Sequence, residues 1–120
     1  MSSRFIRKIR GKNNMKKTEL ITIIEKGYQV GVGKIINYQG KNLAYTYAIQ
    51  KIKGKYIVYM DEYDFDNFYA NEMEYMEQMF AYDSFSQFMK NFQNKHGIRF
   101  EDFYLAKGQK FFDAKLYQNQ

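Results

Sequence analysis

Eight carboxylates lie in one stretch of this 120-residue chain, from Asp61 to Phe88, which contains no Lys or Arg. Nine aromatic side chains share the stretch. The acidic residues are Asp61, Glu62, Asp64, Asp66, Glu72, Glu74, Glu77 and Asp83. Carboxylates this close together can hold a metal ion, act as a general acid and base, or present negative charge to a basic partner.

The spacing of the acids disfavours the first two kinds of chemistry. Asp61, Glu62, Asp64 and Asp66 cluster tightly, but the loop lacks the central Gly and the closing Glu of an EF-hand. A glycosidase pair needs a cleft lined by rings, for which 120 residues leave little material. We therefore expect a solvated acidic segment without a metal ion.

Two further motifs could support phosphate chemistry. Asp102, Asp113 and Lys115 have the acid and acid-x-Lys spacing of metal-dependent nucleases, a match that is frequent by chance. Residues 31–34 read Gly-Val-Gly-Lys, but they lack the other positions of a P-loop or a dinucleotide-binding loop. Glycines that relieve crowding in a strand explain this run better. The sequence predicts neither an enzyme nor a cofactor.

Basic residues dominate the rest of the chain, which has a formal net charge of +6. The N-terminal segment and one later stretch are the candidates for binding nucleic-acid phosphates. Their basic residues are Arg4, Arg7, Lys8, Arg10, Lys12, Lys51, Lys53 and Lys55. We expect residues 1–17 to form a mobile arm, although Met15-Lys16-Lys17 itself has the form of a translation start.

Composition narrows the chemistry further. The chain has no cysteine and one histidine, His96, so disulfides, thiolates and the usual zinc ligand sets are excluded within one chain. Its apolar runs are too short for a membrane span or a signal peptide. These features favour a cytoplasmic protein that does not enter membranes.

The first half of the chain predicts one helix followed by a β-meander. Thr18 to Lys26 carries a short apolar face and ends before Gly27. Residues 28–37, 43–49 and 56–60 alternate large apolar residues with small or polar ones, which indicates strands. Residues 39–42 and 53–54 supply the turns. We expect a three-stranded antiparallel meander, with a helix packed over the small residues of its second strand.

The second half predicts helices. Asn71 and Glu74 form a capping-box pattern, after which apolar residues recur at helical spacing up to Phe80. A second helix should begin at Asp83 or Ser84 and end at Gly97. Residues 99–107 could add helical turns, and residues 110–115 a last strand. The predicted fold is a single α+β domain at residues 18–116, with two or more C-terminal helices on one sheet face and a frayed tail at residues 117–120.

The charge pattern favours one function over another. Carboxylates with exposed rings can imitate nucleic acid, so we expect a non-enzymatic inhibitor of a basic nuclease or other nucleic-acid-binding protein. Anti-defence proteins of phages or mobile elements, and immunity proteins against nuclease toxins, are analogies for it. The alternative is a nucleic-acid-binding module that uses the basic arm and a Lys/Tyr sheet surface. That surface would combine Lys51, Lys53 and Lys55 with Tyr45, Tyr47, Tyr56 and Tyr59. For Tyr45 and Tyr47, burial in the core is the favoured interpretation.

Overall fold

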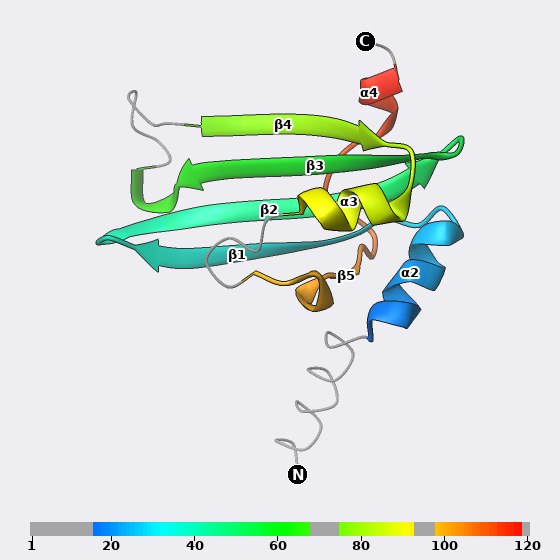
Figure 1. The fold of residues 1–120 in the computed structure, drawn as a ribbon. Helices are drawn as coiled ribbons and strands as arrows, with labels where there is room; N and C mark the ends of the chain where they lie inside the picture. The colour runs from blue at the N-terminus through cyan, green and yellow to red at the C-terminus, as the bar shows by residue number, and fades with distance from the viewer. Residues whose placement is uncertain (1–15, 68–74, 93–97, 119–120) are drawn as a thin grey trace.

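The computed structural model describes residues 16–67, 75–92 and 98–118. Its centre is an antiparallel sheet in the order β4-β3-β2-β1-β5 (Figure 1). The strands are β1 (Val30–Tyr38), β2 (Lys41–Ile52), β3 (Lys55–Asp64), β4 (Tyr75–Tyr82) and β5 (Tyr104–Leu105). The helices are α2 (Lys17–Glu25), α3 (Phe85–Asn91) and α4 (Lys115–Gln118), with 3-10 turns η1 (Phe65–Asn67) and η3 (Phe100–Asp102).

The two hairpins of the meander are confirmed, and their turns explain their register. Gln39 and Gly40 connect β1 to β2, with φ of 52° and 83°. Lys53 and Gly54 connect β2 to β3, with φ of 51° and 82°. Two consecutive positive φ angles are the geometry of the tight turn that matches strand twist. Each hairpin therefore continues directly into a long paired ladder.

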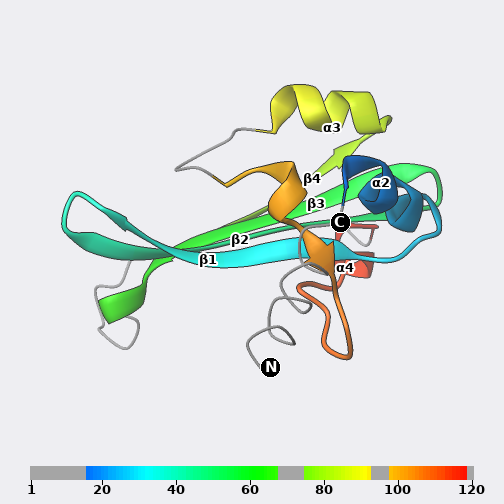
Figure 2. The same cartoon turned by 90° about the horizontal axis from the view of Figure 1, so that it is seen from below.

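The sheet has a different cover on each face, as Figure 2 shows. Helices α2 and α3 lie over one face, where rings and aliphatic side chains form the main core with Tyr47, Ile49 and Val58. Among the described residues, the segment before α4, with Tyr117 of α4, covers part of the other face. There Phe112 and Ala114 pack on Ala48, Ile57 and Tyr59.

The predicted fold class is wrong in its balance of elements. The three-stranded meander is the middle of a five-stranded sheet, and the described helices after it are short. The irregular segment around Phe112 packs on Ala48 of β2 where a covering helix was expected, and Tyr117 of the short helix α4 packs against the same cluster. Residues 110–113 are not the expected strand, and α4 follows them at Lys115–Gln118. Residues 99–107 do contain a helical turn, η3, but it leads into β5.

The largest correction concerns the acidic helix expected after Asn71. Residues 75–82 form the edge strand β4, which pairs with β3 from Tyr56↔Tyr82 to Tyr63↔Tyr75. Phe80 and Tyr82 lie on the face of the main core, whereas Met79 and Ala81 pack on the opposite cluster. A helix would bury one stripe and leave the backbone of β3 unpaired at the sheet edge. Pairing to β3 therefore overrides the helical spacing.

The helix expected after Ser84 is confirmed in position and cap. The Ser84 side chain accepts a hydrogen bond from the backbone N–H of Gln87, which is the standard N-cap interaction. Helix α3 ends at Asn91 with Phe92 already extended, so the predicted end at Gly97 is wrong; Gly97 itself lies outside the described residues. Phe88 is its buried anchor in the core.

Candidate functional site

The end of the sheet where β3 meets η1 collects five of the eleven described acidic residues. Asp61, Glu62 and Asp64 lie on β3, Asp66 lies in η1, and Glu77 lies on β4. Glu77 is the cross-strand neighbour of Asp61, so the two carboxylates share one row of the sheet with Thr46 of β2. Glu72 and Glu74 lie outside the described residues.

One tyrosine links the two paired carboxylates. The Tyr59 hydroxyl lies 2.8 Å from Asp61 Oδ2 and 2.8 Å from Glu77 Oε2. A phenol has a single hydrogen to donate, so it satisfies only one of the two carboxylates at a time. Tyr59 is itself buried, with its ring stacked on Phe112 at 5.2 Å between centroids. The contact with Phe112 therefore fixes the Tyr59 hydroxyl in its position beside the two carboxylates.

The surroundings of Asp61 disfavour its charge. Burial raises the pKa of the Asp61 carboxyl, the neighbouring Glu77 charge adds to the rise, and the hydrogen bond from Tyr59 opposes it. The Asp61 Oδ1 atom is buried and has no hydrogen-bond partner, whereas interactions of the carboxyl with the side chain and backbone of Thr46 offset part of the rise in its pKa. No described basic residue forms an ion pair that would relieve this carboxylate.

On the opposite face of the same strand, Glu62 lies beside Tyr45, its cross-strand partner. Burial raises the pKa of Tyr47 to about 12, and the charges of Tyr45 and Glu62 contribute. Asp66 accepts a hydrogen bond from the Asn42 side-chain amide at 3.0 Å, which fixes η1 against the β1–β2 hairpin. Both faces of this end therefore carry negative charge.

Asp83 does not belong to this group. It follows the other end of β4, six residues and roughly 20 Å of extended strand from Glu77. There its carboxylate forms an ion pair with Lys55 of β3. The structure therefore brings together five of the predicted acidic residues and separates Asp83 from them.

The lysines of the alternative site are largely engaged in the chain's own contacts. Lys51 Nζ lies 2.6 Å from Glu25 Oε1 of α2 and 5.2 Å from the centre of the Tyr56 ring. Lys55 pairs with Asp83, and Lys53 lies in the β2–β3 turn. The arm residues Arg4, Arg7, Lys8, Arg10 and Lys12 lie outside the described residues, as does His96.

The tyrosines of the alternative site are buried. Tyr45, Tyr47, Tyr56 and Tyr59 are each at most 7% exposed, so their faces cannot stack on bases. For Tyr45 and Tyr47 the core interpretation is confirmed, because both belong to the main core cluster. Bases could stack on this sheet only if the four tyrosine rings were exposed to solvent.

The metal and nuclease motifs find little support in the described part of the chain. No three His, Asp or Glu side chains converge there closely enough to hold a metal ion. Asp102 forms ion pairs with Lys34 and Arg99, and Asp113 accepts a hydrogen bond from the backbone N–H of Lys115. Gly31 makes room for Phe111 and does not form a phosphate loop.

The sequence placed Tyr59 in the Lys/Tyr sheet surface and did not reveal its contact with the acidic residues. Part of the signal was present: Tyr59 lies in the strand predicted at residues 56–60, and Asp61, two residues later, shares its face because the strand continues to Asp64. What the sequence did not reveal is Glu77, which reaches the same hydroxyl only because β4 is a strand.

Comparisons with protein-family models, with curated proteins and with solved structures give no match. Within residues 16–67, 75–92 and 98–118, no helix is long and apolar enough to cross a membrane. The function is therefore inferred from the chain's own residues.

Proposed function

We propose that this protein is a non-enzymatic binding protein that engages a basic, nucleic-acid-handling protein through the acidic end of its sheet. The acidic end is the group Asp61, Glu62, Asp64, Asp66 and Glu77. One observation carries the proposal: among the described residues, no ion pair involves Asp61, Glu62, Asp66 or Glu77, although the chain has 19 Lys and Arg. Carboxylates without an ion pair to another described residue are candidates for pairing with basic side chains of a partner.

Exposed apolar groups near the acidic end support a protein partner. Phe65 of η1 is 45% exposed, and Ile35 of β1 is 54% exposed. Interfaces combine such groups with charge, since apolar contact gives affinity and charge gives orientation. A cytoplasmic location is part of the proposal, because a chain without cysteine needs no oxidising compartment.

The test is a charge reversal with a matched control. The double variant Glu62→Lys and Asp66→Lys changes the acidic end, and Glu101→Lys with Asp113→Lys makes the same change in net charge elsewhere. Purified nucleases and DNA-binding proteins of basic charge would be screened by biolayer interferometry, with duplex DNA as competitor. We expect to find a basic protein whose binding to this chain is prevented by DNA. Its affinity should fall at least about tenfold for the Glu62→Lys and Asp66→Lys variant and should be retained by the control variant.

Equal weakening by both double variants would show a response to net charge and would reject the acidic end as the interface. Binding that DNA does not displace would reject the proposal that the partner's nucleic-acid surface is involved. Circular dichroism of both variants checks that the fold is retained.

A further inference from the structure

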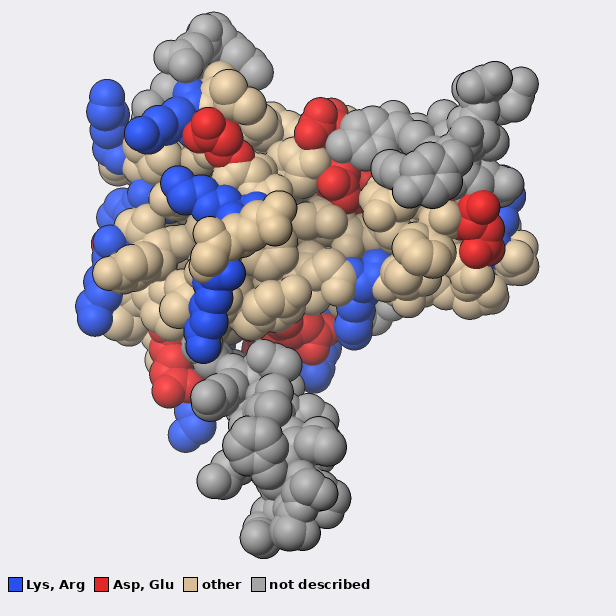
Figure 3. Space-filling view, turned by 180° about the vertical axis from the view of Figure 1, so that it is seen from behind, with Lys and Arg blue, Asp and Glu red and all other residues tan. Residues whose placement is uncertain are grey.

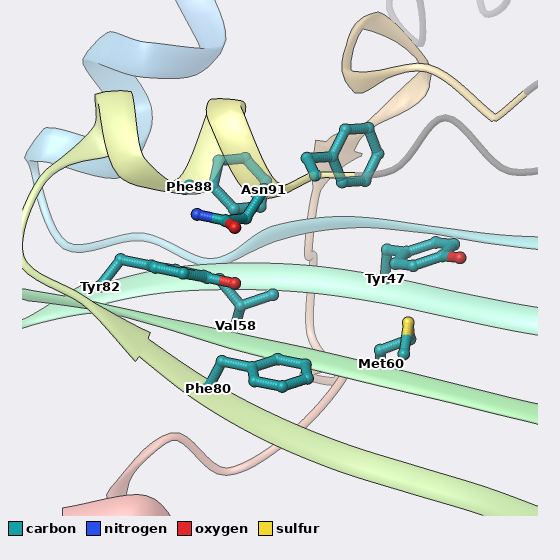
Figure 4. A pocket seen from close by; sticks show the side chains of 8 residues that line it. Tyr47, Val58, Met60, Phe80, Tyr82, Phe88 and Asn91 are labelled. Carbon is teal, nitrogen blue, oxygen red and sulfur yellow. The ribbon is translucent and has the colours of Figure 1, made fainter.

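A small cavity lies between α3 and the outer strands of the sheet. Its volume is about 160 Å³, and Figure 4 shows side chains from β2, β3, β4 and α3 around it. Val58, Met60 and Phe80 come from the sheet, and Phe88 and Asn91 come from α3. The walls are mostly apolar and none of the lining residues is charged.

The cavity has the size and lining for one neutral ring. A cavity of about 150 Å³ with an apolar wall accommodates a benzene-sized molecule. Its aromatic residues already pack on one another: Tyr82 and Phe88 are tilted at 6.3 Å between centroids, and Phe80 and Tyr82 are stacked at 6.4 Å. An added ring would continue that packing and would also reach the Met60 thioether. Phe80 is 37% exposed, so this side of the cavity is open to solvent.

The cavity is continuous with the acidic end along β3. Met60 lines the cavity, and Glu62 lies two residues further on the same face of the strand. Two residues of extended chain span roughly 7 Å. An extended partner segment has the same spacing between alternate side chains, so a ring in the cavity would place a neighbouring basic side chain at Glu62.

We propose that the cavity receives a Phe or Tyr side chain of the basic partner, while a Lys or Arg two residues away pairs with Glu62. The inference rests on the proposed function and adds the chemistry of the partner segment. Charge complementarity and the shared face of β3 select this occupant. Interface energy concentrates in buried rings of this kind, with rim charges fixing their orientation.

Two peptides test the inference by NMR titration of the full-length, ¹⁵N-labelled chain. The first is acetyl-Gly-Lys-Ser-Phe-Ser-Lys-Gly-amide, in which a lysine lies two residues from the ring in either chain direction. The second replaces its Phe with Ala. We expect the Phe peptide to bind at least about tenfold more tightly and to shift the amides of Met60, Phe80 and Phe88.

Variants of the chain test separately how the peptide's ring and its charge contribute to affinity. Asn91→Phe should fill the cavity and remove the advantage of the Phe peptide, whereas Ser86→Phe puts the same ring on an exposed position of α3 and should leave the advantage intact. Phe80→Ala removes a wall and should reduce the advantage as well. Glu62→Lys should weaken both peptides by the same factor.

The outcomes distinguish the two proposals. Equal affinity of both peptides, or an advantage that survives Asn91→Phe and Phe80→Ala, would overturn the inference and leave the charge-based function standing. A ring advantage that persists while Glu62→Lys has no effect would instead count against the acidic end. If free p-cresol binds as tightly as the Phe peptide, the cavity is a small-molecule site and the inference is overturned. Absence of saturable binding by both peptides would overturn it as well.

Discussion

The Asp61 carboxylate shows how one residue position couples charge to stability. Because burial raises its pKa, the folded chain binds a proton at Asp61 more readily than the unfolded chain does. The stabilisation that protonated Asp61 gives to the fold is complete below the pKa that this carboxyl has in the unfolded chain. It is lost as the pH rises through the higher pKa that the carboxyl has in the folded chain. Asp61 therefore opposes folding at neutral pH, where a basic partner would relieve it.

The variant Asp61→Asn tests this directly. The asparagine side chain keeps an oxygen that can accept a hydrogen bond from the Tyr59 hydroxyl, and this side chain cannot ionise. We expect the variant to gain stability relative to the natural chain as pH rises from about 3 to about 7. Urea unfolding at both pH values measures the difference. A relative loss of stability at the higher pH would mean that the charged carboxylate is favoured in the fold.

Position 31 requires glycine because neighbouring atoms leave no room for a Cβ atom. A Cβ atom there would lie 2.5 Å from the Tyr47 backbone oxygen and 2.9 Å from the Phe111 ring. At Gly33, two residues along the same face, the nearest atom would be 3.9 Å away. The two glycines therefore have different reasons to be present, although they look alike in the sequence.

We expect Gly31→Ala to destabilise the fold by about 1–3 kcal/mol, because the added methyl overpacks the sheet against the C-terminal segment. Gly33→Ala is the matched control and should be neutral or stabilising by less than about 1 kcal/mol. Chemical denaturation of both variants decides the point. Similar losses at the two positions would contradict the packing argument.

At the level of elements, the buried side chain of Gln29 attaches the C-terminal segment to the sheet. Its Oε1 accepts the backbone N–H groups of Phe111 and Phe112 at 2.6 and 3.1 Å. Its Nε2 donates to the Phe112 carbonyl and to Gln50, both at 2.9 Å. Residues 111 and 112 have no strand partner, so this one amide replaces the ladder that the sequence predicted there.

The variant Gln29→Met should cost about 2–4 kcal/mol, because it leaves two backbone N–H groups without their acceptor. Amide exchange at Phe111 and Phe112 should accelerate before the rest of the sheet opens. Gln50→Met, which removes a more exposed member of the same network, should cost about 1 kcal/mol. Unchanged exchange at the two amides would show that Gln29 does not hold the segment.

On the scale of the whole molecule, opposite charges are distributed unevenly. Figure 3 shows Lys and Arg concentrated on the side of the β2–β3 turn, with red carboxylates also present towards the other side. The basic side is partly neutralised, since Lys51 and Lys55 already pair with Glu25 and Asp83. Of the two basic stretches that the sequence offers for nucleic-acid contact, the N-terminal one is therefore the better candidate.

We therefore expect the full chain to bind oligonucleotides only at low salt, and a chain starting at Met15 to bind more weakly with a smaller salt slope, because phosphate contacts release counterions. Fluorescence anisotropy with single- and double-stranded DNA at two salt concentrations measures this. Tight binding at near-physiological salt that falls on truncation would favour the nucleic-acid-binding module over our proposal.

Local patterns in the sequence allow prediction of much of the first half of the fold. The alternation around Tyr45 and Tyr47, with turn residues at Gln39-Gly40 and Lys53-Gly54, indicates the meander because period two and tight turns are local properties. The Ser84 cap of α3 is also local. The acidic stretch could be recognised as a charged segment from composition, and Asp61, Glu62, Asp64 and Asp66 do lie together because they are neighbours in sequence.

Only the tertiary structure decides the rest. Tyr75–Tyr82 satisfies a helical spacing, yet it is a strand because the edge of β3 needs a hydrogen-bonding partner and both faces beside it bury apolar side chains. The same pairing brings Glu77 to Asp61 and sends Asp83 to Lys55. The sequence by itself determined which residues carry charge and which segments alternate; the pairing of distant strands determined which charges meet, since that pairing depends on backbone groups that all residues share.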